Sequence, residues 1–115
     1  MKLLSIIVPA YNMEAYIANC IESVLRTPLL AKVEIIVVND GSKDRTSRIA
    51  HEYASQFRDT VRVIDKPNGN YGSTINAALP EVRGEYVKIL DADDSFESSR
   101  VAEMLDFLHK MRGVD

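Results

Sequence analysis

Four short apolar runs, separated by segments with helical periodicity, constrain the fold of this chain more than any other feature. The runs cover residues 3–8, 33–38 and 61–64 and the stretch that begins at residue 86. Short runs of apolar and β-branched residues between turn formers predict strands, and continuous ones predict strands that are buried on both faces. Strands that alternate with helices pack as a parallel sheet with right-handed crossovers and helices on both faces. The sequence therefore predicts an α/β fold with the element order β-α-β-α-β-α-β-α.

The segments between these runs carry apolar residues at helical spacing, which predicts one buried stripe on each helix. Pro9 is expected to end the first strand, because proline cannot donate to a sheet. Asn12 is expected to cap the first helix. The predicted stripes are Met13, Tyr16, Ile17, Cys20, Ile21, Val24 and Leu25 in the first helix, and Ile49, Ala50, Tyr53, Ala54 and Phe57 in the second. They continue with Ile75, Ala78 and Leu79 before Pro80, and with Val101, Met104, Leu105, Leu108 and Met111 in a last helix that starts at Ser98 or Ser99.

Composition narrows the class of protein. The chain has 115 residues, of which 46% are hydrophobic and 27% are charged, so we expect a single globular domain over residues 1–115. The net charge of −3 gives no electrostatic basis for binding nucleic acid. No apolar run approaches the roughly 20 residues that span a bilayer. The single cysteine, Cys20, excludes an internal disulfide and a cysteine-based zinc site, and its place on an apolar stripe predicts a buried structural thiol.

Three aspartates follow the fourth predicted strand. Asp91, Asp93 and Asp94 come directly after an apolar run, at the edge of a parallel sheet where ligands bind. Side chains two positions apart in an extended segment point the same way, so Asp91 and Asp93 are expected to project from one side. Such carboxylates suit Mg²⁺ or Mn²⁺ that is shared with ligand phosphates. An acidic loop that caps the next helix remains an open interpretation, because aspartate and serine also favour turns.

The two other loops at the same edge are less specific. Asp40 ends the second predicted strand within a cluster of turn formers, so it is either a second ligand-facing carboxylate or part of a plain Asx turn. Residues 66–73 are rich in glycine and asparagine and lead into a helix, where backbone N–H groups can receive a phosphate. Neither GxGxxG nor GxxxxGK[ST] is present, so an ordinary connection remains open for this loop.

Together these segments resemble a known family. The stretches LSIIVPAYN (4–12), VVNDGSKD (37–44) and LDADD (90–94) are similar, in order and spacing, to the successive signatures of family 2 glycosyltransferases of the GT-A fold. Residues 68–78 resemble the loop and helix that lie between the second and third of these signatures. The resemblance covers nearly all of the chain. It implies half of a GT-A fold, a Rossmann-like three-layer α/β/α arrangement with a mostly parallel sheet.

The resemblance also implies a site for a nucleotide. In the family, the residues that correspond to Pro9, Ala10 and Tyr11 lie against the nucleoside. The aspartate that matches Asp40 hydrogen-bonds the base, commonly uracil, and the carboxylate can accept an N–H from that base. The aspartate that matches Asp91 lies near the ribose. These five positions are therefore the nucleotide-binding residues that the resemblance predicts.

A divalent metal and a transfer reaction follow from the same resemblance. Asp93 matches the aspartate that coordinates Mn²⁺ or Mg²⁺ at the diphosphate, where the metal stabilises the leaving group. The implied activity is transfer of a sugar from a nucleotide-diphospho-sugar, with a UDP-sugar as the expected donor, to an acceptor hydroxyl. The acceptor is a glycan, a lipid-linked molecule or a protein, as in polysaccharide biosynthesis. Ile75 departs from the family, because many relatives carry arginine there.

The catalytic residue stays unassigned, because no residue here matches the family's general base. Catalytic domains of the family are longer than this chain, so we expect a nucleotide-sugar-binding part that is truncated at its C-terminus and inactive by itself. An uncovered sheet edge would favour self-association. The expected location is the cytoplasm, at the cytoplasmic face of the membrane for the full-length protein.

Two other functions remain open from the sequence. A haloacid-dehalogenase-like phosphatase would use Asp91 as nucleophile and Asp93 as acid beside Mg²⁺, but it would leave Asp40 without a role. A nucleotide-binding module would use the same pocket without transferring a sugar.

Overall fold

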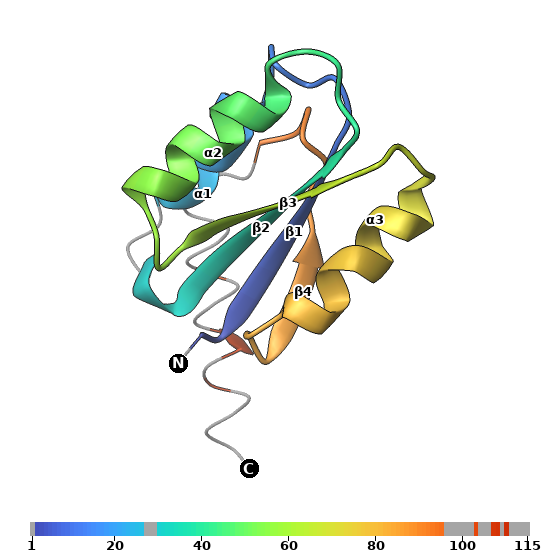
Figure 1. Cartoon of the computed structure of the whole chain (residues 1–115). Coiled ribbons are helices and arrows are strands. Elements are labelled where there is room, and N and C mark those ends of the chain that lie inside the picture. The colour runs from blue at the N-terminus through green and yellow to red at the C-terminus, as the bar shows by residue number, and fades with distance from the viewer. Residues whose placement is uncertain (1, 27–29, 96–102, 104–106, 109, 111–115) are drawn as a thin grey trace.

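The described part of the chain is a four-stranded parallel sheet with helices on both faces (Figure 1). The computed structural model describes residues 2–26, 30–95, 103, 107–108 and 110. The elements are β1 (Leu4–Ala10), α1 (Ile17–Leu25), β2 (Val33–Asp40), α2 (Thr46–Gln56), β3 (Val61–Lys66), α3 (Tyr71–Ala78) and β4 (Tyr86–Ile89), with 3₁₀ turns at Leu30–Lys32 and Leu79–Glu81. The strand order is β3-β2-β1-β4, and each neighbouring pair is parallel. The predicted α/β alternation is thus confirmed as far as β4.

The predicted last helix lies largely outside the described residues. Of that segment, Glu103, Phe107, Leu108 and Lys110 are described and are helical. None of the helices within the described ranges is long and apolar enough to cross a bilayer.

Alternate side chains of the two central strands, β1 and β2, pack against helices on opposite faces of the sheet, which gives three layers. Helices α1 and α2 lie on one face of the sheet and α3 lies on the other (Figure 1). Ile6 and Ile35 belong to the core on the side of α1 and α2, whereas the adjacent Ile7 and Ile36 belong to a smaller core with Ala78 of α3. Successive strand residues point to opposite faces, so strands covered on both faces need a continuous apolar run. This is why the residues of β2 and nearly all those of β1 are buried.

Pro9 lies inside β1 and does not end it, so that prediction was wrong. Pro9 is in register with Val38 of β2. Ile7 accepts a hydrogen bond from the N–H of Leu90 (2.9 Å), on the β4 side of β1. Residues two apart in a strand bond to the same neighbour, and β4 ends at Ile89, opposite Ile7. Proline is tolerated at Pro9 because no ladder bond from β4 is left to make there.

Asn12 is not the cap of α1, which begins only at Ile17. Asn12 has a left-handed backbone with φ 51°, which asparagine tolerates better than most residues. Its N–H donates to Ser42 Oγ (2.9 Å), and its Oδ1 accepts from the N–H of Lys43 (2.8 Å). The residue therefore joins two loops. The later helix start also leaves Tyr16, which was predicted to be internal, 54% exposed.

Strand β4 is the open edge of the described sheet. Among the described strands it pairs only with β1, and the side chains of Val87 and Ile89 are 45% and 39% exposed. These two residues are in register with Ser5 and Ile7, so they point to the face that carries α3. Strand β4 is therefore covered less than the other strands of the described sheet. Leu79, which was predicted to lie on a buried stripe, is 49% exposed, so that prediction was wrong.

A buried carboxylate lies among the apolar residues of β2. Glu34 is fully buried, and its Oε2 accepts hydrogen bonds from Ser5 Oγ (2.5 Å) and the N–H of Arg83 (2.6 Å). Its Oε1 accepts from Arg62 Nη2 (2.9 Å) and Arg83 Nε (3.1 Å). Burial alone would raise the pKa of Glu34, but these hydrogen bonds outweigh it and lower the pKa to about 2. Glu34 thus connects β1, β2, β3 and the segment before β4. It lies at the edge of the sheet where the strands begin, opposite their carboxyl ends.

Candidate functional site

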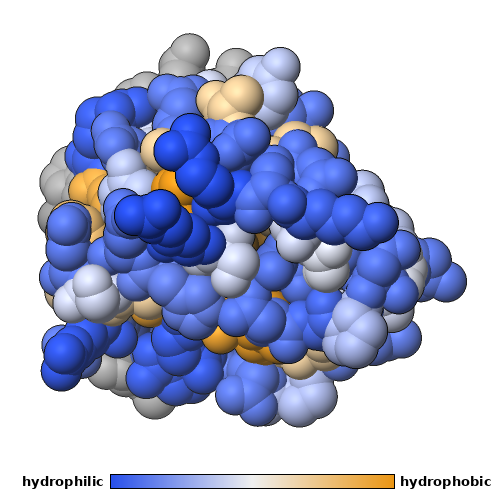
Figure 2. All heavy atoms as spheres, turned by 45° about the horizontal axis from the view of Figure 1, so that its top comes forward, coloured by the Kyte–Doolittle hydropathy of each residue, from blue (hydrophilic) through white to orange (hydrophobic). Residues whose placement is uncertain are grey.

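The six residues that the sequence singled out lie together in one pocket at the carboxyl edge of the sheet. The pocket has a volume of about 370 Å³ and is formed by the ends of β1 and β2, the start of α3 and the turn after β4. Its lining residues are Pro9, Ala10, Tyr11, Met13, Asp40, Tyr71, Thr74, Asp91, Ala92 and Asp93. Figure 2, turned so that this edge comes toward the viewer, shows a mostly hydrophilic face with small hydrophobic areas. Four further residues, Met13, Tyr71, Thr74 and Ala92, also line the pocket and were not predicted as site residues.

Asp40 is a buried carboxylate that is hydrogen-bonded through one of its two oxygens. It is only 6% exposed, and its Oδ1 accepts hydrogen bonds from Lys66 Nζ (2.8 Å) and from the N–H of Gly69 (2.9 Å). Burial would raise its pKa, but the bonds from Lys66 and Gly69 outweigh burial and lower the pKa. Asp40 does not form the plain Asx turn among the described residues. Its neighbour Asn39 accepts at Oδ1 from the N–H of Ser42 (3.2 Å), three residues further on. Asp40 is therefore ionised at neutral pH.

Hydrogen bonds between loops hold the wall of the pocket. Asp44 Oδ1 accepts from the N–H of Thr46 (2.9 Å) at the start of α2, and its Oδ2 accepts from the N–H of Glu14 (3.2 Å). Thr46 Oγ1 accepts from the N–H of Met13 (2.7 Å). The segment after β1 is thus anchored to the start of α2. Spacing alone offered no signal for these contacts, because the partners lie about 30 residues apart in the chain.

Glycine allows the loop after β3 to lie directly on the end of β2. Gly41 has φ +71°, and a Cβ on it would come within 2.6 Å of the backbone nitrogen of Asn68. Asn68 Nδ2 donates to the carbonyl oxygen of Asp40 (3.0 Å) at the same place. A side chain at Gly41 would therefore push residues 66–70 away from Asp40.

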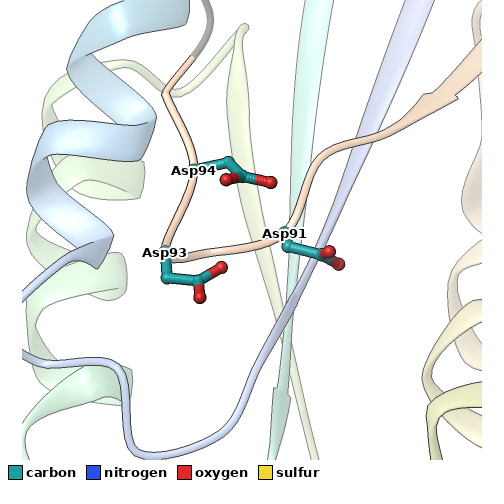
Figure 3. A group of neighbouring side chains, drawn as sticks. All are labelled: Asp91, Asp93 and Asp94. Carbon is teal, nitrogen blue, oxygen red and sulfur yellow. The ribbon is translucent and has the colours of Figure 1, made fainter.

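The three aspartates after β4 are brought together by a turn. The N–H of Asp94 donates to the carbonyl oxygen of Asp91 (2.9 Å), and carboxylate oxygens of Asp91, Asp93 and Asp94 lie within 4.8 Å of one another (Figure 3). The extended geometry that was predicted for Asp91 and Asp93 is wrong, since the strand ends at Ile89. The turn also adds Asp94 to the group. All three residues are exposed, whereas Ala92 between them is buried and fixes the turn to the core.

This group of carboxylates suits a hard divalent cation. Oxygen ligands are those that Mg²⁺ and Mn²⁺ prefer, and oxygens this close repel one another unless water or a cation intervenes. Within the described ranges, no lysine, arginine or histidine forms an ion pair with Asp91, Asp93 or Asp94. The residues present therefore fit a metal ion.

Tyr71 is the first residue of α3 and lines the pocket. Its hydroxyl donates to Asp91 Oδ1 at 3.4 Å, while Asn70 Oδ1 caps the helix by accepting from the N–H of Ser73 (2.8 Å). Burial, followed by the negative charge of Asp91, raises the pKa of Tyr71. Ile75 packs against the small core under α3 and does not line the pocket. At this position, where the resemblance implied arginine, the side chain thus serves packing.

Cys20 is confirmed as a buried residue on the inner face of α1. Its thiol donates to the carbonyl oxygen of Asp91 (3.7 Å), behind the acidic turn. Burial, together with the charges of the three aspartates, raises the pKa of Cys20 to about 12. A thiol held in this way is not a nucleophile.

Comparisons with known proteins point to one family of transferases. The sequence profile described as Glycosyl transferase family 2 matches residues 5–114. The uncharacterized glycosyltransferase EpsJ of Bacillus subtilis (strain 168) is 46% identical over 98 residues, which are 84% of this chain and 28% of EpsJ. The chain therefore spans less than a third of that relative.

Two solved structures are similar over nearly the whole chain. One is S. aureus TarS 1–349 in complex with UDP, with a TM-score of 0.84, 29% identity, and coverage of 96% of this chain and 32% of that one. The other is the mannosyltransferase PcManGT from Pyrobaculum calidifontis in complex with GDP-Man and Mn²⁺, with a TM-score of 0.82 and 25% identity. It matches 91% of this chain and 32% of its own. With its four parallel strands and its profile match over residues 5–114, this chain belongs to glycosyltransferase family 2 and has the GT-A type of α/β fold.

Proposed function

We propose that this chain is the nucleotide-sugar-binding part of a glycosyltransferase domain. The proposal rests on one observation. All six residues that were predicted for the nucleotide and the metal line the same pocket, which has a volume of about 370 Å³. Similar solved proteins are complexes with UDP, with UDP-GlcNAc and with GDP-Man and Mn²⁺. A UDP-sugar is the proposed donor because of the family resemblance, in which the aspartate that matches Asp40 commonly meets uracil. Asp40 offers an acceptor for the N–H of that base.

Each lining residue has a proposed role toward the nucleotide. Pro9, Ala10 and Tyr11 form the wall against which the nucleoside lies, and Asp40 accepts a hydrogen bond from the base. Asp91 accepts from a ribose hydroxyl, for which Tyr71 holds its carboxylate in place. Ionised carboxylates make stronger hydrogen bonds than neutral groups, so Asp40 and Asp91 orient the donor as well as bind it.

Asp93 is the proposed ligand of a divalent cation. Mn²⁺ or Mg²⁺ at this group of carboxylates supplies positive charge that stabilises the diphosphate as the leaving group. Asp94, whose carboxylate lies within the same 4.8 Å group, is a second candidate ligand. Family 2 membership argues against the dehalogenase-like phosphatase, in which Asp91 and Asp93 would serve as nucleophile and acid.

The proposed reaction transfers the sugar to an acceptor hydroxyl on a glycan, a lipid-linked molecule or a protein. The described residues of the pocket offer no carboxylate beyond those assigned to nucleotide and metal, so the general base is left unassigned. We propose that this chain by itself binds nucleotide without turning it over. A nucleotide-binding module that never transfers sugar is the alternative, and sugar transfer by a longer protein that includes this chain separates the two.

The test is calorimetric titration of the chain with UDP and GDP, with and without Mn²⁺. We expect saturable binding of UDP that strengthens when Mn²⁺ is present, because the diphosphate and the acidic turn repel each other without a cation. GDP serves as the comparison that shows which base the pocket prefers. Absence of saturable binding of either nucleotide in Mn²⁺ would contradict the proposal.

We also propose that the open edge at β4 lets the chain associate with itself. An uncovered edge strand with exposed apolar side chains is a template for pairing, and Val87 and Ile89 supply such side chains. Sedimentation velocity over a range of concentrations is expected to show association, and V87K and I89K are expected to reduce it. A monomer at every concentration would speak against this proposal.

A further inference from the structure

Lys66 is a half-buried cation beside the pocket and is not one of its lining residues. It is the last residue of β3, and its side chain is 17% exposed. Its Nζ donates to Asp40 Oδ1 (2.8 Å), Ser73 Oγ (3.0 Å) and the carbonyl oxygen of Pro67 (2.7 Å). Three acceptors in reach match the three donors of an ammonium group. Lys66 is thus fully engaged by the protein and does not reach a ligand directly.

Lys66 determines which oxygen of Asp40 is left for a ligand. Oδ1 already accepts from Lys66 and from the N–H of Gly69. Oδ2 has no hydrogen-bond partner among the described residues. Since Asp40 lines the pocket, Oδ2 is the atom through which it meets a base.

Lys66 also offsets the forces that disfavour charge on Asp40. Burial opposes ionisation of Asp40, and the carboxylates of Asp91 and Asp93 line the same pocket. The hydroxyl of Tyr71 also lines it, but carries no positive charge. Within the described residues, Lys66 is the one cationic side chain paired with Asp40. Without it, only the N–H of Gly69 would stabilise the ionised form.

The same ammonium group connects three elements around the pocket. It joins the ends of β2 and β3 to the first turn of α3 through Asp40 and Ser73. Gly69 lies close to both groups, because a Cβ added there would lie 2.5 Å from Ser73 Oγ and 3.1 Å from Lys66 Nζ. Hydrogen bonds from several elements orient a carboxylate before the ligand binds, which lowers the conformational entropy lost on binding.

We propose that Lys66 is a positioning residue for the nucleotide base, because it keeps Asp40 ionised and turned so that Oδ2 accepts an N–H of the base. This inference rests on the proposed function, since it needs a nucleotide in the pocket. Lys66 acts through Asp40 and is not itself a contact of the ligand.

The test compares K66M, K66R and wild type in UDP titrations with Mn²⁺ across a pH series. K66M is expected to weaken binding about tenfold at neutral pH and to move the acid limb of the binding curve upward by about one pH unit, because burial then raises the pKa of Asp40. K66R keeps the charge and is expected to retain the wild-type pH profile. K43M controls for loss of charge alone, because Lys43 is an exposed residue of the neighbouring loop. Among the described residues, its backbone N–H forms a hydrogen bond but its side chain forms no hydrogen bond or ion pair.

The outcomes separate this inference from the proposed function. If wild type binds UDP and K66M shows the same pH profile as wild type, the inference is overturned, whatever the change in affinity. If K66M weakens binding equally at all pH values and lowers the thermal midpoint, Lys66 is only structural. If wild type itself fails to bind, it is the proposed function that fails. A shifted acid limb in K66M, rescued by K66R, supports the positioning role.

Discussion

Replacing Asp93 with asparagine is expected to abolish the gain in UDP affinity that Mn²⁺ provides. Asparagine keeps the shape of the side chain but removes one of three negative charges whose oxygens lie within 4.8 Å. Hydrogen bonds and ligand contacts of charged groups contribute about 1.5–3 kcal/mol, so binding in Mn²⁺ should fall by roughly 10- to 100-fold. Titration of D93N with UDP, with and without Mn²⁺, measures the loss directly.

D59N is the matched control for this experiment. Asp59 is an exposed aspartate of the loop before β3, at the opposite end of the sheet, so the same change of charge occurs away from the pocket. We expect D59N to bind UDP as wild type does, with and without the metal. Unchanged metal-dependent binding by D93N would show that Asp93 is not a metal ligand.

Replacing Glu34 with glutamine is expected to cost about 3 kcal/mol of folding stability. The variant keeps the volume of a fully buried side chain but removes the charge that Arg62 and Arg83 meet at 2.9 and 3.1 Å. A carboxyl whose pKa falls from its ordinary 4.5 to about 2 in the folded chain contributes on the order of 3 kcal/mol at neutral pH. The loss of a buried ion pair and the pKa shift of Glu34 thus predict a similar loss of stability. Urea unfolding of E34Q and wild type at neutral pH measures this difference in the free energy of unfolding.

The pH dependence of stability gives an independent test of the same network. The pKa of Glu34 is lowered on folding, so its contribution is present above pH 4.5 and is lost as the pH falls from 4.5 toward about 2. In E34Q this part of the pH dependence should be missing. E52Q is the control, because the Arg48–Glu52 pair is exposed and worth only about 0.3–0.5 kcal/mol. Equal stability of E34Q and wild type at pH 7 would contradict a stabilising role for this network.

The sequence predicted the elements of the fold well because their signals are local. Continuous apolar runs indicated strands covered on both faces, and β1 and β2 have that burial. The apolar stripe that was predicted from Met13 to Leu25 is confirmed in its middle part, where Ile17, Cys20 and Ile21 are fully buried. It failed at its start, since Asn12 joins loops and does not cap the helix. A cap and a loop bridge use the same asparagine side chain, and only the fold decides between them.

The position of the pocket was also predictable from the sequence. Parallel strands bring their carboxyl ends to one edge, so residues at or just after the ends of β1, β2 and β4 had to meet there, and they line one pocket. The detailed geometry was not predictable. Asp91 and Asp93 come together through a turn that also recruits Asp94, where an extended strand was expected.

By itself, the sequence determined the order of the elements, the α/β class, the family resemblance and the edge of the sheet where acidic residues gather. Only the tertiary structure decided which polar groups are partners. Lys66 and Asp40 are 26 residues apart in the chain, and Glu34 and Arg83 are 49 apart. The physical reason is that periodicity reports which face of an element is buried. A hydrogen bond or ion pair depends instead on distances of about 3 Å between atoms of different elements, which exist only once the sheet has assembled.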